Sequence, residues 1–160
     1  MTRTLFLDAN CLQSLDLSSA IDLVEPILQK REIANYEQSL QFKIDYPLAP
    51  EDPRELSEIP EVRLWFIRLD ACYPWLPILL DWKAGELARY TAMLVPHEFH
   101  RTEGIQYNPE GLEIWLMHKI FTIAPWLQQY DVPSKARLKS MAQMFGYELE
   151  DGLFDLVCLA

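Results

Sequence analysis

Residues 40–46 read Leu-Gln-Phe-Lys-Ile-Asp-Tyr, an unbroken alternation of apolar and polar side chains. Successive side chains of a β-strand point to opposite faces, so this stretch predicts a strand with one buried and one solvated face. Thr4 to Asp8 is typical of a second short strand. In the middle of the stretch from Val62 to Leu69, consecutive residues are all apolar, so both faces of a strand there would be buried. This favours a central strand. The N-terminal half is therefore expected to form a sheet.

Helical signals lie around and after these strands. Ser19-x-x-Asp22 has the form of a capping box, and the helix that follows is expected to bend at Pro26. Caps, stops and apolar stripes predict further helices over Lys83–Leu94, after Asn108-Pro109, after Ser134 and over Leu153–Val157. Early strands and late helices favour the α+β class, with a small antiparallel or mixed sheet packed against a mostly helical C-terminal half. We expect a single domain over residues 1–160.

The composition limits the classes of partner. The chain has 160 residues, half of them hydrophobic, and a formal net charge of −10. This charge repels nucleic acids and anionic membranes, so neither is expected as a partner, and a basic or mixed protein surface fits better. No apolar run is long enough to insert stably in a membrane. Without a secretory signal at Met1, and with Cys11, Cys72 and Cys158 expected as reduced and mostly core thiols, the predicted location is the cytoplasm.

An acidic, proline-rich segment runs from Pro47 to Pro60. It holds four prolines, and its four acids are offset only by Arg54. Proline cannot donate to a strand ladder, so an exposed loop is predicted, and a loop of this length is more often functional than idle. The aromatic run Trp65, Phe66, Tyr73, Trp75 and Trp82 is expected to be mostly core, with Trp75 and Trp82 as the exposed exceptions. The candidate partner-binding residues are Glu51, Asp52, Glu55, Glu58, Trp75 and Trp82.

Two groups of residues are candidates for a site of chemistry. His97-Glu98-Phe99-His100, with Glu103 and His118 nearby, is the closest approach to a metal site, but its histidines are three apart in a predicted loop. A polar surface loop is the preferred interpretation, and a small metal-dependent enzyme using His97 and His100 with nearby carboxylates is the alternative. Asp81 and Glu86, with Lys83 and Arg89, are candidates for an acid/base pair. Glu86 and Arg89 are three apart on a predicted helix, so an ordinary surface ion pair is the preferred interpretation. No catalytic residue, metal or cofactor is predicted.

A third possibility is a DNA-binding helix. Lys135, Arg137 and Lys139 precede Ala142 and Gly146 in a pattern that hints at a helix-turn-helix. Acidic residues from Glu148 to Asp155 line the would-be recognition element and would repel phosphates. A solvated basic helix face is the preferred interpretation.

Several continuous motifs carry a family resemblance. They are Asp52-Pro-Arg-Glu-Leu-Ser-Glu-Ile-Pro-Glu, Leu64-Trp-Phe-Ile-Arg-Leu-Asp, Tyr73-Pro-Trp, Asp81-Trp-Lys-Ala-Gly-Glu-Leu-Ala-Arg-Tyr, Leu94-Val-Pro-His, Tyr107-Asn-Pro-Glu and Leu138-Lys-Ser-Met-Ala-Gln. From Leu40 to Leu149 the chain resembles the chlororespiratory reduction family, sixth of its series, from cyanobacteria and chloroplasts.

The resemblance implies an assembly factor for the photosynthetic NAD(P)H dehydrogenase complex. Such a factor would mature the hydrophilic arm by handling its iron–sulfur subunit I, without joining the finished enzyme. Without a transit peptide before the motifs, a cyanobacterial protein is expected. The resemblance assigns no functional residue, so the candidate residues rest on the sequence pattern alone.

Overall fold

A computed structural model describes residues 1–159, with side chains as far as Val157. The chain divides into two compact units, Met1–Asn108 and Pro109–Ala160, and each is described by itself. The predicted α+β class is confirmed: the strands lie in the first unit and the later part of the chain is mostly helical. The organisation as a single domain stays a prediction.

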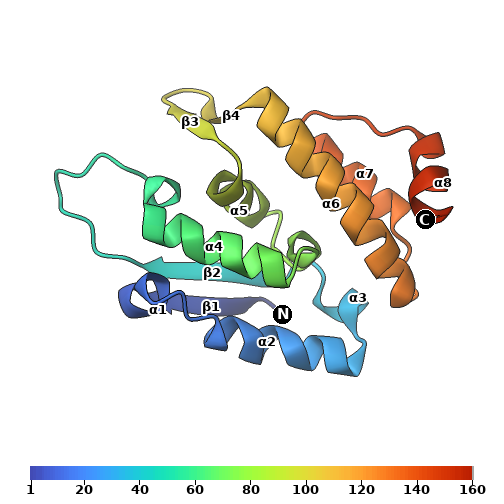
Figure 1. Ribbon diagram of the computed structural model, residues 1–160, viewed down its shortest axis with the longest axis horizontal. Coiled ribbons are helices and arrows are strands. Elements are labelled where there is room, and N and C mark those ends of the chain that lie inside the picture. The colour runs from blue at the N-terminus through green and yellow to red at the C-terminus, as the bar shows by residue number, and fades with distance from the viewer. Residues whose placement is uncertain (160) are drawn as a thin grey trace. The chain divides into compact units, whose positions relative to one another are not determined.

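The first unit opens with two strands that pair in parallel. Leu5 lies opposite Phe42 and Leu7 opposite Ile44. The pairing is parallel because the chain returns to the start of the sheet through helices instead of a tight turn (Figure 1). The elements of this unit are β1 (Arg3–Asp8), α1 (Ala9–Gln13), α2 (Ser18–Lys30), α3 (Ile33–Tyr36), β2 (Leu40–Asp45), η1 (Leu56–Glu58), α4 (Pro60–Cys72), η2 (Leu76–Ile78), α5 (Glu86–Leu94), β3 (His97–His100) and β4 (Gly104–Tyr107).

An aromatic cluster joins β2, α4 and α5. The ring of Phe66 lies 5.0 Å from those of Phe42 and Trp65 and 6.0 Å from that of Tyr90, in edge-to-face arrangements. Such pairs stabilise a fold by about 0.5–1.5 kcal/mol each beyond the area they bury. The two polar tips are satisfied, since Trp65 Nε1 donates to the Asp16 carbonyl and the Tyr90 hydroxyl donates to Asp70. Burial of Tyr90, together with the Asp70 carboxylate, raises the pKa of its hydroxyl.

The prediction of a central strand over Val62–Leu69 was wrong, because this stretch lies inside α4. The buried side chains are Val62, Trp65, Phe66 and Leu69, whereas Leu64 and Ile67 are 51% and 46% exposed. A spacing of three and four residues is the period of a helix face, not of a strand. Pro60 supplies the start, since proline is favoured at the first helical position.

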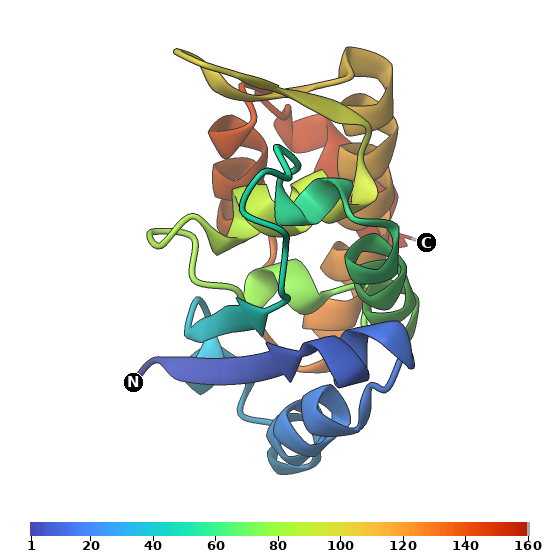
Figure 2. The ribbon, with the colours of Figure 1, turned by 90° about the vertical axis from the view of Figure 1, so that its left-hand side faces the viewer.

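The segment around His97 was expected to be a loop and is instead a β-hairpin. Strand β3 pairs antiparallel with β4, with His97 opposite Tyr107 and Phe99 opposite Ile105 (Figure 2). The Tyr107 hydroxyl fastens the hairpin to α5 by donating to the Ala88 carbonyl at 2.7 Å. Burial raises the pKa of Tyr107 to about 12, so this donor stays protonated at neutral pH.

Two predicted helix starts differ in detail from the structure. Helix α2 begins at Ser18 without a side-chain cap of its own, so the Ser19-x-x-Asp22 capping box was wrong. Instead, the Asp16 carboxylate accepts both the backbone N–H and the hydroxyl of Ser18. Helix α5 begins at Glu86 instead of Lys83, because Gly85 at its N-cap adopts the left-handed conformation with φ of 82°.

The second unit is helical throughout its assigned elements, α6 (Pro109–Gln129), α7 (Lys135–Met144) and α8 (Asp151–Leu159). The predicted starts at Pro109 and after Ser134 are confirmed. The Lys135 and Lys139 ammonium groups both contact the Asp151 carboxylate, which opens α8. The charges of Lys135 and Lys139 on the basic helix face are therefore paired within the unit.

The cysteines are less buried than the sequence analysis predicted. Cys11 is half-buried and Cys72 exposed, both as free thiols, so neither is a core residue; the side chain of Cys158 lies outside the described part. Burial raises the pKa of the Cys11 thiol, helped by Asp16 and Asp8. Among the described residues, no helix combines the length and apolar character that crossing a membrane requires.

Candidate docking cleft

Five segments of the first unit enclose a cleft of about 210 Å³. Its walls come from β2, η1, α4, α5 and the β3–β4 hairpin. The lining is mostly apolar and consists of Phe42, Ile44, Leu56, Phe66, Tyr90, Ala92, Met93, Phe99 and Ile105, with Glu55, Ser57, Glu86 and Arg89 as its polar members. A concave apolar surface with a few polar groups is the usual form of a binding site.

The predicted acidic segment borders this cleft. Residues 46–55 form an exposed loop, as expected, which leaves β2 and re-enters the fold at η1 (Figure 1). For the rest of the segment, residues 56–60, the prediction of a loop was wrong, because η1 and the start of α4 occupy it and Ser57 and Ile59 are buried. Glu55 and Leu56 then line the cleft itself. Glu51, Glu55 and Glu58 are exposed. The charged loop and the apolar cleft are therefore continuous. The sequence did not reveal this, because the residues of the loop and those of the other cleft walls lie far apart along the chain.

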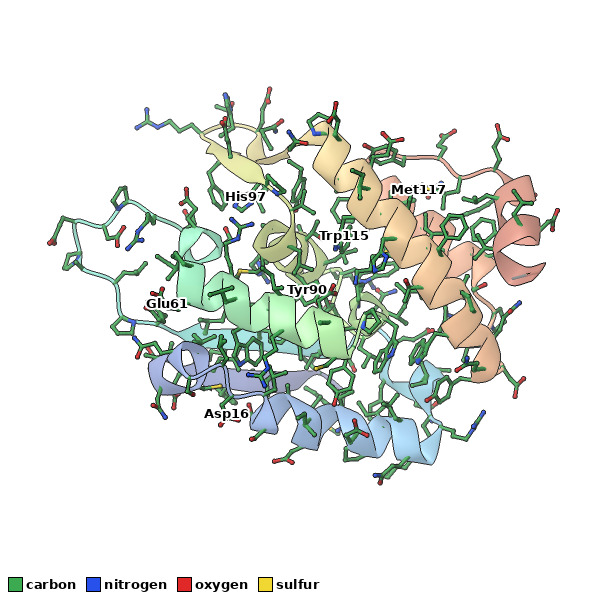
Figure 3. The ribbon with its side chains drawn as sticks, viewed as in Figure 1. Asp16, Glu61, Tyr90, His97, Trp115 and Met117 are labelled. Carbon is green, nitrogen blue, oxygen red and sulfur yellow. The ribbon has the colours of Figure 1, made fainter. Side chains whose placement is uncertain are left out.

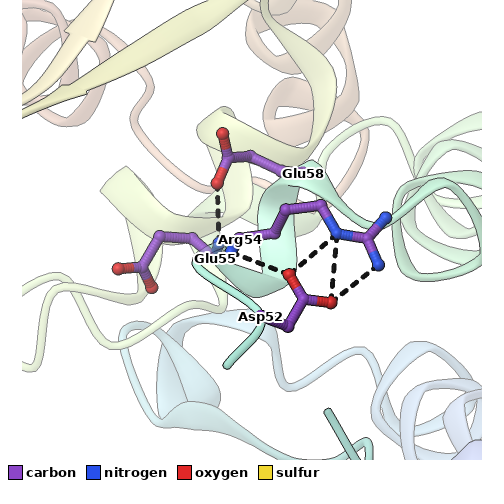
Figure 4. A network of polar contacts seen from close by, with 4 residues as sticks. All are labelled: Asp52, Arg54, Glu55 and Glu58. Carbon is purple, nitrogen blue, oxygen red and sulfur yellow. Dashed lines mark hydrogen bonds and ion pairs between the residues drawn. The ribbon is translucent and has the colours of Figure 1, made fainter. Parts of the chain in front are cut away.

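A local network holds the end of this loop (Figure 4). Glu58 accepts the backbone N–H of Glu55 at 2.6 Å, and the Glu55 side chain accepts the N–H of Glu58, which forms a capping box. Arg54 folds back onto Asp52, with Nη2 2.8 Å from Oδ2. The hydrogen bonds from Arg54 lower the pKa of Asp52 to about 2. Arg54 is paired with Asp52, so it offsets the charge of that residue, and Glu51, Glu55 and Glu58 add three further acidic side chains to the exposed surface.

An ion pair with a buried carboxylate and an exposed guanidinium lies at the α5 side of the cleft. Glu86 is only 5% exposed, and its Oε1 accepts from Nη2 of Arg89 at 2.8 Å. The same guanidinium nitrogen donates to the Ala84 carbonyl. The predicted surface pair of Glu86 and Arg89 is thus confirmed as a pair, but its carboxylate is buried. Asp81 makes different contacts: its carboxylate accepts hydrogen bonds from the Gln41 side chain and from the backbone N–H of Ala84. The hydrogen bond from Gln41 lowers the pKa of Asp81.

A serine and a histidine meet where η1 touches the hairpin. The Ser57 hydroxyl lies 3.0 Å from Nε2 of His97, and Nδ1 of His97 lies 2.9 Å from the Val95 carbonyl. Figure 3 shows His97 near the base of the hairpin and Tyr90 beside α4. Ser57 is 5% exposed, and the Val95 carbonyl orients the ring of His97. The contact joins two walls of the cleft.

The two tryptophans proposed as docking residues lie apart from these walls. Trp75 is 6% exposed and packs on Tyr73 with ring centroids 5.4 Å apart. Trp82 is half-buried, and its Nε1 donates to the Pro77 carbonyl. The expectation of exposure was thus wrong for Trp75, and any docking role for either residue stays a prediction. The core positions predicted for Trp65, Phe66 and Tyr73 are confirmed.

The histidines considered as metal ligands do not converge. Residues three apart in a strand point to opposite faces, and His100 contacts Thr102, whereas His97 contacts Ser57. Within residues 1–157, the part with described side chains, His, Cys, Asp and Glu form no group of three or more that could hold a metal ion. The arrangement offers binding surface, with no metal cage in the described part.

The family is decided by comparison with known proteins. Residues 7–156 match the family described as Chlororespiratory reduction 6. The chain belongs to the chlororespiratory reduction 6 family. No solved structure matches the chain. Membership in this family indicates a role in assembly of the NAD(P)H dehydrogenase complex and therefore a protein partner within that complex.

Residues that sequence reasoning missed come from three walls of the cleft: the hairpin, η1 and α5. Phe99 and Ile105 face each other across the hairpin, and Ser57 belongs to the family motif Asp52–Glu61 without having been singled out. Met93 and Ala92 on α5 were not among the predicted helix-face residues either. Signals in advance came from the alternation that placed Phe42 and Ile44 on one face of a strand, and from the acidic segment that contains Glu55.

Proposed function

We propose that this member of the chlororespiratory reduction 6 family is a non-catalytic assembly factor that binds iron–sulfur subunit I. Binding would take place in the cytoplasm of a cyanobacterium while the hydrophilic arm of the photosynthetic NAD(P)H dehydrogenase complex matures. The observation that carries this proposal is the apolar cleft bordered by an exposed acidic loop. Family membership indicates which complex the protein helps to assemble, and the cleft with its acidic loop is a surface suited to binding another protein.

The chemistry of the surface supports binding of a client over catalysis. Three exposed carboxylates, Glu51, Glu55 and Glu58, stand beside an apolar cleft. Complementary charge speeds the encounter of two proteins, and apolar contacts then slow their separation. A factor that must release its client benefits from an interface of modest size with a strong electrostatic component.

Reconstituted binding tests the proposal directly. Purified subunit I and the other hydrophilic-arm subunits are each titrated against this chain by isothermal calorimetry. Subunit I is expected to bind with a Kd of about 1 μM or below, corresponding to about 8 kcal/mol. Binding of a different subunit alone would leave an assembly factor but assign it another client. Failure of every subunit to bind would contradict the proposed function.

A further inference from the structure

We propose that the cleft binds one aromatic or branched apolar side chain of the client, carried on a short segment with Lys or Arg on either side. This inference rests on the proposed function and names the chemistry that the client must present. It concerns the cleft lined by Phe42, Ile44, Met93, Phe99 and Ile105.

The size and lining of the cleft suit such a side chain. An apolar cavity of about 150 Å³ holds a benzene-sized ring, so a cleft of about 210 Å³ accommodates one ring or branched chain. Phe99, at the edge of the cleft, is 41% exposed, and Ile44, Leu56 and Ile105 are half-buried. These side chains would lose their remaining contact with water when the cleft is filled, which favours binding. Met93 adds an adaptable wall because its thioether chain adjusts to different shapes.

The charges at the cleft select the neighbours of that side chain. Glu55 and the buried Glu86 line it, and Glu51 and Glu58 lie on the same loop and turn as Glu55. The arginines near the cleft have partners: Arg54 pairs with Asp52, and Nε of Arg63 donates to the Met93 carbonyl. Arg89 pairs with Glu86, so the charges that select the client are those of Glu51, Glu55 and Glu58. A client segment with Lys or Arg next to its apolar anchor finds carboxylates, and an acidic segment is repelled.

The probe is a set of three seven-residue peptides. The first has a central Phe between Lys-Arg pairs, the second replaces the Phe by Ser, and the third places the Phe between Glu pairs. Binding is followed by methyl NMR of protein labelled at its Ile and Met methyl groups. The first peptide is expected to shift Ile44, Met93 and Ile105, and to leave Ile114 and Met117 of α6 unchanged. The Ser peptide is expected to bind at least about tenfold more weakly because it lacks the buried apolar side chain. The Glu peptide is expected to bind at least about tenfold more weakly because the carboxylates of the loop repel it.

A matched pair of variants locates the contact. Phe99→Ser removes an aromatic side chain from the edge of the cleft, and Phe6→Ser removes a 67% exposed one from β1, outside the cleft lining. We expect Phe99→Ser to weaken the first peptide about tenfold and Phe6→Ser to change its affinity less than about twofold. Unchanged methyl spectra of the remaining core residues show that each variant is folded.

Three results would overturn the inference: equal binding of the Glu-flanked peptide, shifts centred on Ile114 and Met117, or no binding of the first peptide at millimolar concentration. The outcome is separable from the proposed function. If subunit I binds wild type and Phe99→Ser equally well, the inference fails and the assembly role stands. If the first peptide binds as described and subunit I does not, the choice of client fails and the specificity of the cleft stands.

Discussion

The hydroxyl of Ser57 lies 3.0 Å from Nε2 of His97, although the two residues are 40 positions apart in the chain. A carbonyl oxygen only accepts hydrogen bonds, so the contact with Val95 fixes Nδ1 of His97 as the N–H nitrogen. In the neutral ring Nε2 then accepts from Ser57. This bond ties the turn that ends the acidic loop to the hairpin that forms the opposite wall of the cleft.

Removing this tie should loosen the hairpin. For Ser57→Ala we expect the free energy of unfolding to fall by about 1 kcal/mol, the usual net contribution of one hydrogen bond. Amide exchange in β3 and β4 should accelerate more than in β1 and β2. Thr102→Ala is the matched control, because Thr102 makes a comparable but exposed contact of 3.3 Å to His100. Equal exchange rates in wild type and Ser57→Ala, or labelling of Ser57 by a fluorophosphonate, would contradict a structural role.

The ion pair of Asp52 and Arg54 lowers the pKa of Asp52, so a substitution of Arg54 should change that pKa. Hydrogen bonds from Arg54 hold the pKa of Asp52 at about 2. Because the pKa is lower in the folded state, the pair stabilises the fold above the unfolded-state pKa of about 3.9. That contribution is lost as the pH falls toward 2. In Arg54→Gln the pKa of Asp52 should rise toward its ordinary value, measured by NMR of the carboxyl carbon.

Asp16 is the internal control for that titration. Its pKa is lowered by the hydroxyl and the backbone N–H of Ser18, far from Arg54 in sequence. The titration of Asp16 should be the same in wild type and Arg54→Gln. An unchanged Asp52 would show that Arg54 does not hold it in solution, and the carboxylates of the loop would then have a positive neighbour available.

Gly85 combines a strained backbone with a close neighbour. Its φ is 82°, and a Cβ at this position would lie 3.2 Å from Nη1 of Arg89. Left-handed backbone costs a residue with a side chain about 1–2 kcal/mol, so Gly85→Ala should lower the free energy of unfolding by at least that amount. Urea denaturation measures the change. The loss should exceed this range because displacement of Arg89 weakens its bond to the buried Glu86 carboxylate.

Two other glycines separate these contributions. Gly104 has φ of 74° with open space around it, so Gly104→Ala reports the backbone cost alone. Gly152, in α8, has open space and no positive φ, and Gly152→Ala should be neutral or slightly stabilising. If Gly85→Ala and Gly104→Ala lose the same free energy, the contact with Arg89 has no energetic role.

Two elements were predicted correctly because each had a clear period or a strong boundary residue. Alternation placed β2, and Pro109 placed the start of α6. The stretch from Val62 to Leu69 was wrongly predicted as a strand because its adjacent residues Trp65 and Phe66 are both apolar and buried. Adjacent buried residues occur both in a central strand and on a wide buried face of a helix. Pro60 at the first helical position was the available signal for a helix.

The cleft was beyond prediction from the sequence because its walls are assembled by pairings between distant residues. The parallel register of β1 and β2 brings Phe42 and Ile44 into place, and the hairpin supplies Phe99 and Ile105. The acidic loop could be predicted from composition, but its position beside an apolar cleft depends on where η1 returns to the fold. Trp75 was expected at the surface and is buried, because adjacent prolines do not prevent a ring from entering the core.

The association rate constant for this chain and purified subunit I tests the central claim most directly. Wild type is compared with a triple Glu→Gln variant at positions 51, 55 and 58, which removes three charges and keeps the capping acceptors. A Glu→Gln variant at Glu110 and Glu113, exposed acids of α6, is the control. We predict that the triple variant associates about tenfold more slowly at low salt, and that the difference vanishes at high salt. Equal association rates at low salt would contradict the account.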